Sequence, residues 1–179
     1  MSTQTKTPPL DSLEYRPYLT ADGQIDEDVA GKIGVYAVFD GDRSMMYVGY
    51  SRDVYLSLKQ HLIRQPHHCY WVKIQMIPRP SRTVLAEIAS AWIAENGKTP
   101  IGNDIQQQLW TEPIDANPAM TEEEKAQYQQ SEESKQIKIR KQVARRVEAQ
   151  ILSQLSDRGV KMEIRFNPKL KEKGLLDLK

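Results

Sequence analysis

The sequence has only one cysteine, Cys69, among its 179 residues, so no disulfide can form within the chain. Because disulfides are rare in the reducing interior of cells, this composition predicts a cytoplasmic protein. No apolar run approaches the roughly 20 residues that a membrane-spanning helix needs. The polar N-terminal stretch also lacks the apolar centre of a secretory signal. We therefore expect neither a membrane protein nor an exported one.

The sequence also lacks an excess of charge of either sign. Its 25 Lys and Arg residues and 24 Asp and Glu residues leave a formal net charge of +1. Any affinity for nucleic acid must therefore come from a local basic patch, because the molecule as a whole has almost no net attraction for phosphate. What the chain does contain, 39% hydrophobic and 27% charged residues, is typical of a globular protein with a core.

Three segments have the composition of β-strands, since they are rich in β-branched and aromatic residues. They are residues 34–40, 45–51 and 70–77. Between the first two, Asp40 and Gly41 form a dipeptide typical of a two-residue hairpin turn, because both residues tolerate positive φ. We therefore expect a small three-stranded sheet with mixed or antiparallel pairing.

Apolar residues at helical spacing predict two helices that flank this sheet. The first runs over residues 52–64, and the second follows Ser81 as its N-cap and ends at Gly97. Together the strands and helices predict an α+β domain over residues 15–110, preceded by a flexible N-terminal arm at residues 1–14.

Residues 111–179 predict a helical extension, made of a polar linker, a long amphipathic helix and a C-terminal strand or tail. Thr121 and Glu124 have the spacing of a capping box, and no Pro or Gly follows until after Leu155, which favours one continuous helix. Its apolar stripe must be buried, against the first domain, against a protein partner or against a second copy. Residues 160–166 alternate like a strand.

The hairpin segment places a glycine near a tyrosine twice, as GVY at residues 34–36 and as YVG at residues 47–49. Because side chains alternate along a strand, hairpin pairing can bring Tyr36 and Tyr47 to one surface of the sheet. They could be ordinary strand aromatics that fill a half-buried face. The glycines could permit close backbone approach, or they could make room for a phosphate.

The two tripeptides, His61 on the following helix and the order hairpin, helix, strand, helix resemble the GIY-YIG nuclease superfamily over residues 34–103. Gly34 and Gly49 match the paired glycines of the motif, and Asn103 matches the structural asparagine that closes the module. The segments VYAVFD, VGYSRDV, WIAENG and TPIGN are most similar to the version of this domain that plants join to a chloroplast monothiol glutaredoxin, and to its cyanobacterial stand-alone relatives.

This resemblance implies an endonuclease that hydrolyses DNA phosphodiester bonds with one Mg²⁺ or Mn²⁺ ion. It implies that Tyr36 activates the attacking water and that Tyr47 and His61 contact the phosphate or the leaving group. It also implies that Glu87, on the second helix, holds the metal ion. Such chemistry needs an activated nucleophile and stabilisation of negative charge on the phosphoryl oxygens.

Two departures from the motif favour a different function. Ser57 stands where the family has a helix arginine, and a serine cannot supply a fixed positive charge. Arg52 or Arg64 could substitute for it as a phosphate contact. Glu87 falls nearly opposite the apolar arc of its helix, as a solvent-exposed residue would. The sequence therefore predicts a weak nuclease or, alternatively, a catalytically degenerate GIY-YIG fold that binds nucleic acid or protein.

The long C-terminal helix carries basic residues that could follow a phosphate backbone. Lys138, Lys141 and Arg145 are the candidates for binding DNA. The alternative is a solvated helix face, because acidic residues near its start and basic residues further along suit the helix dipole.

Overall fold

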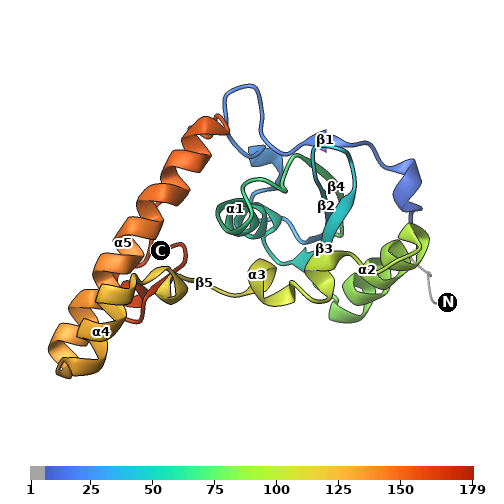
Figure 1. Ribbon diagram of the computed structural model, residues 1–179. Helices are drawn as coiled ribbons and strands as arrows, with labels where there is room; N and C mark the ends of the chain where they lie inside the picture. The colour runs from blue at the N-terminus through green and yellow to red at the C-terminus, as the bar shows by residue number, and fades with distance from the viewer. Residues whose placement is uncertain (1–6) are drawn as a thin grey trace. The chain divides into compact units, whose positions relative to one another are not determined.

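The computed structural model describes residues 7–179. The chain divides into two compact units, Met1–Thr111 and Glu112–Lys179. Both units combine helices with antiparallel strands, so the predicted α+β class is confirmed (Figure 1). Over residues 7–179, no helix combines the length and the apolar character that crossing a membrane would require.

The first unit is built on an antiparallel sheet with the strand order β1-β4-β2-β3. The strands described within residues 7–111 are β1 (Arg16–Pro17), β2 (Gly34–Phe39), β3 (Met45–Ser51) and β4 (Trp71–Met76). The helices of the same range are α1 (Val54–Arg64), α2 (Arg82–Asn96) and α3 (Gln107–Thr111), with 3₁₀ turns at Leu10–Ser12, Glu27–Val29 and Ile101–Asn103. The three predicted strands are present, and β1 adds a fourth that the sequence did not predict, because two residues are too few to form a pattern.

The connection between β2 and β3 is longer than the two-residue turn that the sequence predicted. It spans residues 40–44, and the positive φ falls at Arg43 (61°) instead of Gly41. The Asp40 carboxylate accepts hydrogen bonds from the backbone N–H groups of Asp42 and Ser44, at 3.0 and 2.9 Å. An aspartate side chain therefore organises this turn, as Asp does in many loops.

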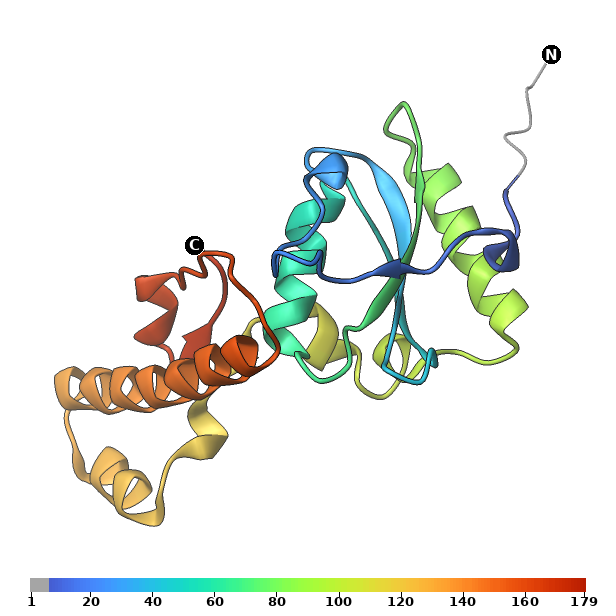
Figure 2. The ribbon, with the colours of Figure 1, turned by 90° about the horizontal axis from the view of Figure 1, so that it is seen from above.

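The two faces of the sheet are covered by different helices (Figure 2). One face carries Val35, Ala37 and Phe39, which belong to one buried cluster with Ile88 and Trp92 of α2. Because side chains alternate along β2, the residues between them point to the other face, where α1 packs. Side chains on α1 and on α2 are thus separated by the sheet.

Local signals determine the ends of both helices. Asp53 caps α1, since its carboxylate accepts a hydrogen bond from the N–H of Leu56 at 3.3 Å. Ser81 caps α2 in the same way through the N–H of Val84, also at 3.3 Å. Gly97 ends α2 in the left-handed conformation (φ 85°), as the sequence predicted.

The predicted flexible arm is packed over its described part, residues 7–14. Leu10 is buried, and its carbonyl accepts a hydrogen bond from Nζ of Lys73 at 3.1 Å. The indole N–H of Trp92 donates to the Pro8 carbonyl at 3.3 Å. These contacts hold the segment to the domain through groups distant in sequence. Residues 1–6 of the predicted arm lie outside the described residues.

The second unit combines helices with a two-stranded sheet. Its elements are β5 (Ile114–Asp115), a 3₁₀ turn (Asn117–Ala119), α4 (Glu122–Gln130), α5 (Glu133–Asp157), α6 (Pro168–Lys171) and β6 (Leu175–Leu176). The predicted capping box is confirmed, because Thr121 Oγ1 accepts from the N–H of Glu124 at 3.1 Å and the Glu124 carboxylate accepts from the N–H of Thr121 at 2.9 Å. The predicted strand at 160–166 is wrong, since only Phe166 of this segment pairs, in an isolated bridge with Leu178.

The single long helix predicted after Thr121 is also wrong, because it is broken into α4 and α5. Ser131 adopts an extended conformation there, and its hydroxyl donates to the Gln127 carbonyl at 2.5 Å. The two helices are held together by an ion pair at 2.7 Å between Arg146 of α5 and Glu124 of α4. The Arg146–Glu124 pair, which joins residues 22 positions apart, thus favours a break between α4 and α5 although no Pro or Gly is present there.

Candidate functional site

Tyr36, Tyr47 and His61 lie together on the face of the sheet that α1 covers. The hydroxyl oxygen of Tyr36 is 2.8 Å from Nε2 of His61. The ring centres of Tyr47 and His61 are 4.6 Å apart, and those of the two tyrosines are 6.2 Å apart. The β2–β3 register explains this, because Tyr36 stands directly opposite Gly49 and Tyr47 precedes Gly49 by two residues on the same face.

Gly49 leaves the space that the two tyrosine rings occupy. A Cβ atom at this position would lie 2.7 Å from the Tyr36 hydroxyl and 2.6 Å from Cε1 of Tyr47. Gly34 meets a different need, since its Cβ would lie 2.7 Å from the backbone oxygen of Gln75 on β4. Of the two glycines, one makes room for the rings and the other allows two strands to approach closely.

Trp110 of α3 is a fourth member of this cluster. Its ring stacks on Tyr47, with the ring centres 5.5 Å apart and the planes 4° from parallel, and it lies 5.7 Å from the His61 ring. Trp110 is completely buried. Trp110 was not among the site residues predicted from the sequence, where the available signal was an isolated tryptophan among polar residues.

Asn103 joins the segment before α3 to the free edge of the sheet. Its side-chain amide donates to the Val48 carbonyl at 2.7 Å and accepts from the Val48 N–H at 2.8 Å. Val48 lies in β3, an edge strand, so the asparagine satisfies backbone groups that would otherwise lack a partner strand. The neighbouring Gly102 leaves room for Trp110, because a Cβ there would lie 2.8 Å from its ring. This corner of the fold therefore holds the tryptophan over the cluster.

Burial makes the cluster electrically neutral at pH 7. It raises the pKa of Tyr36 far above that of an ordinary phenol, and the neighbouring Tyr47 raises it further. Burial raises the pKa of Tyr47 as well. The pKa of His61 falls to about 3, because burial disfavours the imidazolium and the Arg64 guanidinium repels it. A neutral imidazole can accept the Tyr36 hydroxyl proton as a hydrogen bond.

Arg64, one of the two substitutes considered for the absent helix arginine, lies close to this cluster. Burial raises the pKa of Tyr36 and of Tyr47, and the positive charge of Arg64 lowers both pKa values by a smaller amount. Its Nη1 donates to the Trp110 carbonyl at 3.1 Å. Arg52, the other substitute, is exposed to solvent. Ser57 occupies the predicted arginine position, and its hydrogen bond with Tyr36 also lowers the pKa of that phenol.

Glu87, the predicted metal ligand, is not brought to the cluster. It is exposed on α2, the helix that packs on the opposite face of the sheet from Tyr36 and His61. In residues 7–179, no group of three His, Cys, Asp or Glu side chains is arranged to hold a metal ion. Mg²⁺ and Mn²⁺ prefer carboxylate oxygens. The phenols, imidazole and indole of the cluster therefore do not fit the expected ion.

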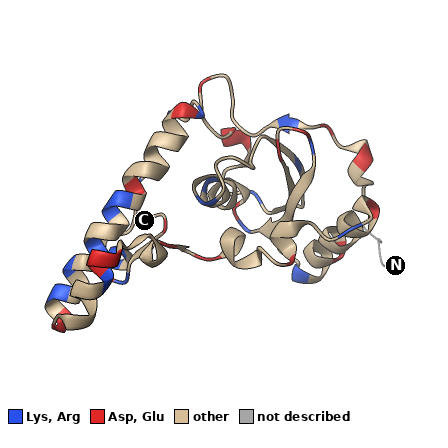
Figure 3. Ribbon diagram, in the orientation of Figure 1, with Lys and Arg blue, Asp and Glu red and all other residues tan. Residues whose placement is uncertain are grey.

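Figure 3 shows Lys and Arg residues at several places along α5. The three basic candidates on this helix differ in their surroundings. Lys138 and Arg145 are exposed, whereas Lys141 lies 3.6 Å from the Glu172 carboxylate in an ion pair. The apolar stripe of the same helix is covered within the chain, since Ile139 and Val143 are both buried. The helix thus offers exposed cations to a partner, together with the apolar side chain of Leu152, which is 39% exposed.

Comparison with known proteins gives one partial similarity. No family model matches the chain. The chain is similar to the bifunctional monothiol glutaredoxin-S16, chloroplastic, of Arabidopsis thaliana, with 35% identity over 81 residues. The aligned region is 43% of this chain and 28% of the plant protein, so the chain matches little more than a quarter of that protein's length.

Proposed function

We propose that the Met1–Thr111 unit is a GIY-YIG-like module that has lost efficient phosphodiester cleavage, and that the chain binds DNA. The proposed loss of cleavage rests on one observation, which is that the side chains of the cluster are already bound to one another. Trp110 stacks on Tyr47, and the Tyr36 hydroxyl is bound to a neutral His61. Tyr36 is 3% exposed, so a phosphate would have to displace neighbouring side chains to reach its hydroxyl, whereas Tyr47 is partly exposed.

The protonation states oppose the chemistry that the resemblance implies. A phenol acts as a base only as its phenolate, and burial raises the pKa of Tyr36 far above neutral pH. Stabilising a pentacoordinate phosphoryl group requires fixed positive charge or a metal ion. Arg64 is the nearby cation, and its Nη1 already donates to the carbonyl of Trp110. Arg64 therefore does not simply take over the phosphate-binding role of the arginine that is missing at Ser57.

Binding to DNA is supported by exposed cations in both units. Lys138 and Arg145 are exposed on α5, and Arg52 is exposed just before α1. The net charge of +1 means that these local charges, rather than the whole molecule, would attract phosphates. The partial similarity to a bifunctional protein supports a module that can accompany other domains. A cytoplasmic location stays a prediction.

A second candidate function is weak DNA cleavage with one Mg²⁺ or Mn²⁺ ion. The convergence of Tyr36, Tyr47 and His61 on one face favours it. Tyr36 would then activate water, and Glu87 would have to reach the ion from the other side of the sheet. The two candidates differ in whether a substrate phosphate ever reaches the phenols.

A plasmid-nicking assay separates the two candidates. The wild-type protein is incubated with supercoiled plasmid and Mg²⁺ or Mn²⁺, beside Tyr36→Phe, Glu87→Ala and the matched controls Tyr50→Phe and Glu95→Ala, which change exposed residues. We expect no metal-dependent nicking. Nicking that Tyr36→Phe and Glu87→Ala abolish and the two controls retain would establish the nuclease instead.

DNA binding is tested by measuring affinity for a short duplex across a salt series. We expect the logarithm of the affinity to fall linearly with the logarithm of salt, and removing two phosphate contacts should lower the slope by about 2. The test variant is Lys138→Gln/Arg145→Gln, and Lys161→Gln/Arg165→Gln is a control with the same change in charge. A salt-independent affinity, or equal effects of both double variants, would exclude a phosphate-tracking role for α5.

A further inference from the structure

A second cluster of charged and aromatic residues lies on the opposite face of the sheet from the tyrosines. Lys73 of β4 pairs with Ala37 and so points to the α2 face. It is 4% exposed, and its Nζ lies 4.1 Å from the centre of the Tyr15 ring. The guanidinium of Arg43, in the β2–β3 turn, lies 4.5 Å from the same ring centre and 4.6 Å from that of Trp71. Two cations are thus gathered at one tyrosine.

Neither cation is held in a direct ion pair within residues 7–179. The side chain of Lys73 makes one hydrogen bond, to the Leu10 carbonyl, although an ammonium group has three donors. No carboxylate of that range forms an ion pair with Lys73 or with Arg43. Burying a charge without a counter-charge is costly, and contact with aromatic rings offsets only part of that cost. An anion that contacts both cations would complete the cluster.

The turn holds Arg43 in place before any ligand arrives. Its φ of 61° lies in the left-handed region, which residues other than glycine rarely adopt. The Asp40 carbonyl accepts the Arg43 N–H at 3.0 Å, and the Asp40 carboxylate binds the residues on either side. The stacking on Tyr15 and Trp71 then orients the guanidinium plane. Such an ordered guanidinium loses little entropy when it binds a phosphate or carboxylate.

A cavity of about 380 Å³ opens at these residues. Lys73, Arg43, Tyr15 and Phe39 line it, and so do the exposed carboxylates of Asp11 and Glu95. This volume falls within the range of small-molecule sites and exceeds the need of a lone phosphate ion. The two carboxylates disfavour a second anionic group and can accept hydrogen bonds from hydroxyl groups. The lining of the cavity is therefore cationic at Arg43 and Lys73 and accepts hydrogen bonds at Asp11 and Glu95.

We propose that this Arg43–Lys73 cleft binds a hydroxylated phosphate monoester, such as a sugar phosphate. A dianionic phosphate matches the two cations, and the guanidinium fork matches two phosphate oxygens. The hydroxyl groups of the ligand face Asp11 and Glu95. This site is independent of the tyrosine–histidine cluster and does not require DNA binding or cleavage.

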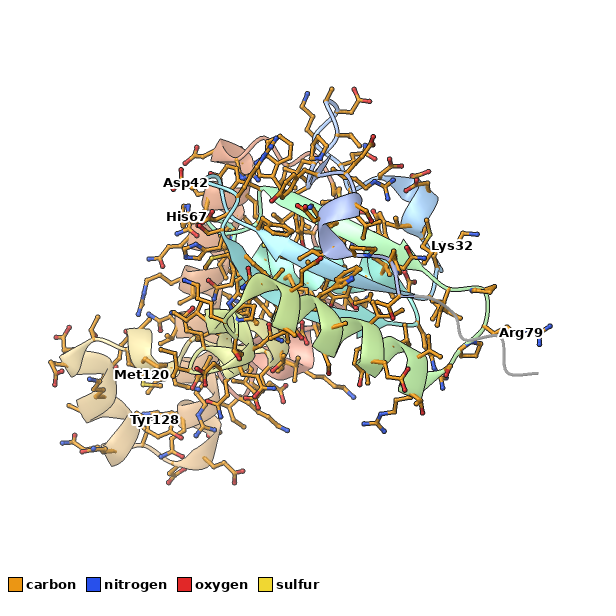
Figure 4. The ribbon with its side chains drawn as sticks, turned by 90° about the vertical axis from the view of Figure 1, so that its right-hand side faces the viewer. Lys32, Asp42, His67, Arg79, Met120 and Tyr128 are labelled. Carbon is orange, nitrogen blue, oxygen red and sulfur yellow. The ribbon has the colours of Figure 1, made fainter. Side chains whose placement is uncertain are left out.

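Isothermal titration calorimetry with glucose 6-phosphate tests the proposal at constant ionic strength, with inorganic phosphate and glucose as comparison ligands. Arg79→Gln is the matched control for Arg43→Gln, because both remove one exposed arginine. Figure 4 shows Asp42, which precedes Arg43, and Arg79 at opposite ends of the sheet. We expect saturable binding of glucose 6-phosphate, weaker binding of inorganic phosphate and none of glucose. Arg43→Gln should weaken binding by about tenfold or more and Arg79→Gln by no more than about twofold.

Lys73→Met, which keeps the length of the side chain, should abolish binding, and circular dichroism checks that it folds. Because Lys73 is buried and Arg43 is exposed, the Arg43→Gln result stands even where Lys73→Met is unstable. The proposal is overturned if neither phosphate ligand saturates, if glucose binds as well as its phosphate, or if Arg79→Gln weakens binding as much as Arg43→Gln does.

Discussion

At the scale of single residues, Gly49 is required because any side chain at this position would clash with the rings of Tyr36 and Tyr47. It stands opposite Tyr36 in the β2–β3 register, and both tyrosine rings lie over it. The pairing of tyrosine with glycine in the sequence is thus a packing requirement, since only a residue without Cβ leaves room for two rings on neighbouring strands. This requirement holds whether or not the phenols act on a substrate.

Gly49→Ala should lower the free energy of unfolding by about 1–3 kcal/mol, the usual cost of overpacking a filled core. Gly41→Ala is the control, because a Cβ there meets only Cγ of Tyr70, at 3.9 Å. Urea denaturation of both variants measures the difference. Equal stability of the two variants would mean that the rings move aside freely.

His61 should make the stability of the protein depend on pH between about 7 and 3. Its pKa of about 3 in the folded protein lies below the ordinary value near 6.5, so the unfolded chain binds the proton more tightly. Stability is therefore full above the unfolded pKa and falls as pH drops towards 3, by up to about 1.4 kcal/mol per pH unit. The slope is largest where the unfolded histidine is protonated and the folded one is not.

Urea denaturation at pH 7 and pH 5 tests this for the wild type, His61→Gln and the exposed-residue control His67→Gln. We expect His61→Gln to lose less stability between the two pH values than the wild type does. His67→Gln should follow the wild type. A His61→Gln variant with unchanged pH dependence would show that the imidazole protonates in the folded protein.

At the scale of elements, the side chain of Asn103 forms hydrogen bonds with the outer edge of β3, where no further strand pairs. Asn103 makes two hydrogen bonds to the backbone of Val48, and the segment it anchors leads into α3 and Trp110. A β-strand edge protected in this way does not present those groups to another chain. The same clamp fixes the helix that covers the tyrosine–histidine cluster.

Asn103→Ala should destabilise the protein by about 1–3 kcal/mol, because it removes two hydrogen bonds and leaves partly buried backbone groups without them. Asn96→Ala, which removes a single exposed bond to the Lys98 carbonyl, is the comparison and should cost less. Chemical denaturation gives both values. Hydrogen exchange at the Val48 amide should also accelerate in Asn103→Ala, and an unchanged rate there would argue against the clamp.

At the scale of the whole molecule, the chain consists of two compact units, and α3 ends the first. A unit with its own core is able to fold alone. The fragment Met1–Thr111 should therefore unfold cooperatively. The shorter fragment Met1–Gln106 keeps Asn103 but lacks Trp110, and it should be less stable by about 3–5 kcal/mol, the usual cost of removing a buried tryptophan.

Denaturation followed by near-ultraviolet circular dichroism compares the two fragments. Equal stability would mean that Trp110 is not part of the core of the first unit. Failure of both fragments to fold would mean that the first unit depends on residues 112–179.

The sequence by itself determined the local elements. Alternation and β-branched composition predicted β2, β3 and β4, and caps such as Ser81 and Gly97 marked the ends of helices, because these signals act within a few residues. The same alternation predicted that Tyr36 and Tyr47 share a surface. The roles of the site residues in DNA chemistry stay predictions, because the geometry does not test catalysis.

Only the tertiary structure decided which distant residues meet. It placed Trp110 over Tyr47, exposed Glu87 on the helix across the sheet, and gathered Arg43 and Lys73 around Tyr15. It also broke the long helix at an ordinary serine, where Arg146 pairs with Glu124. The physical reason is that spacing along a chain specifies which face of an element is apolar, whereas the partner of that face depends on packing between segments that are far apart in sequence.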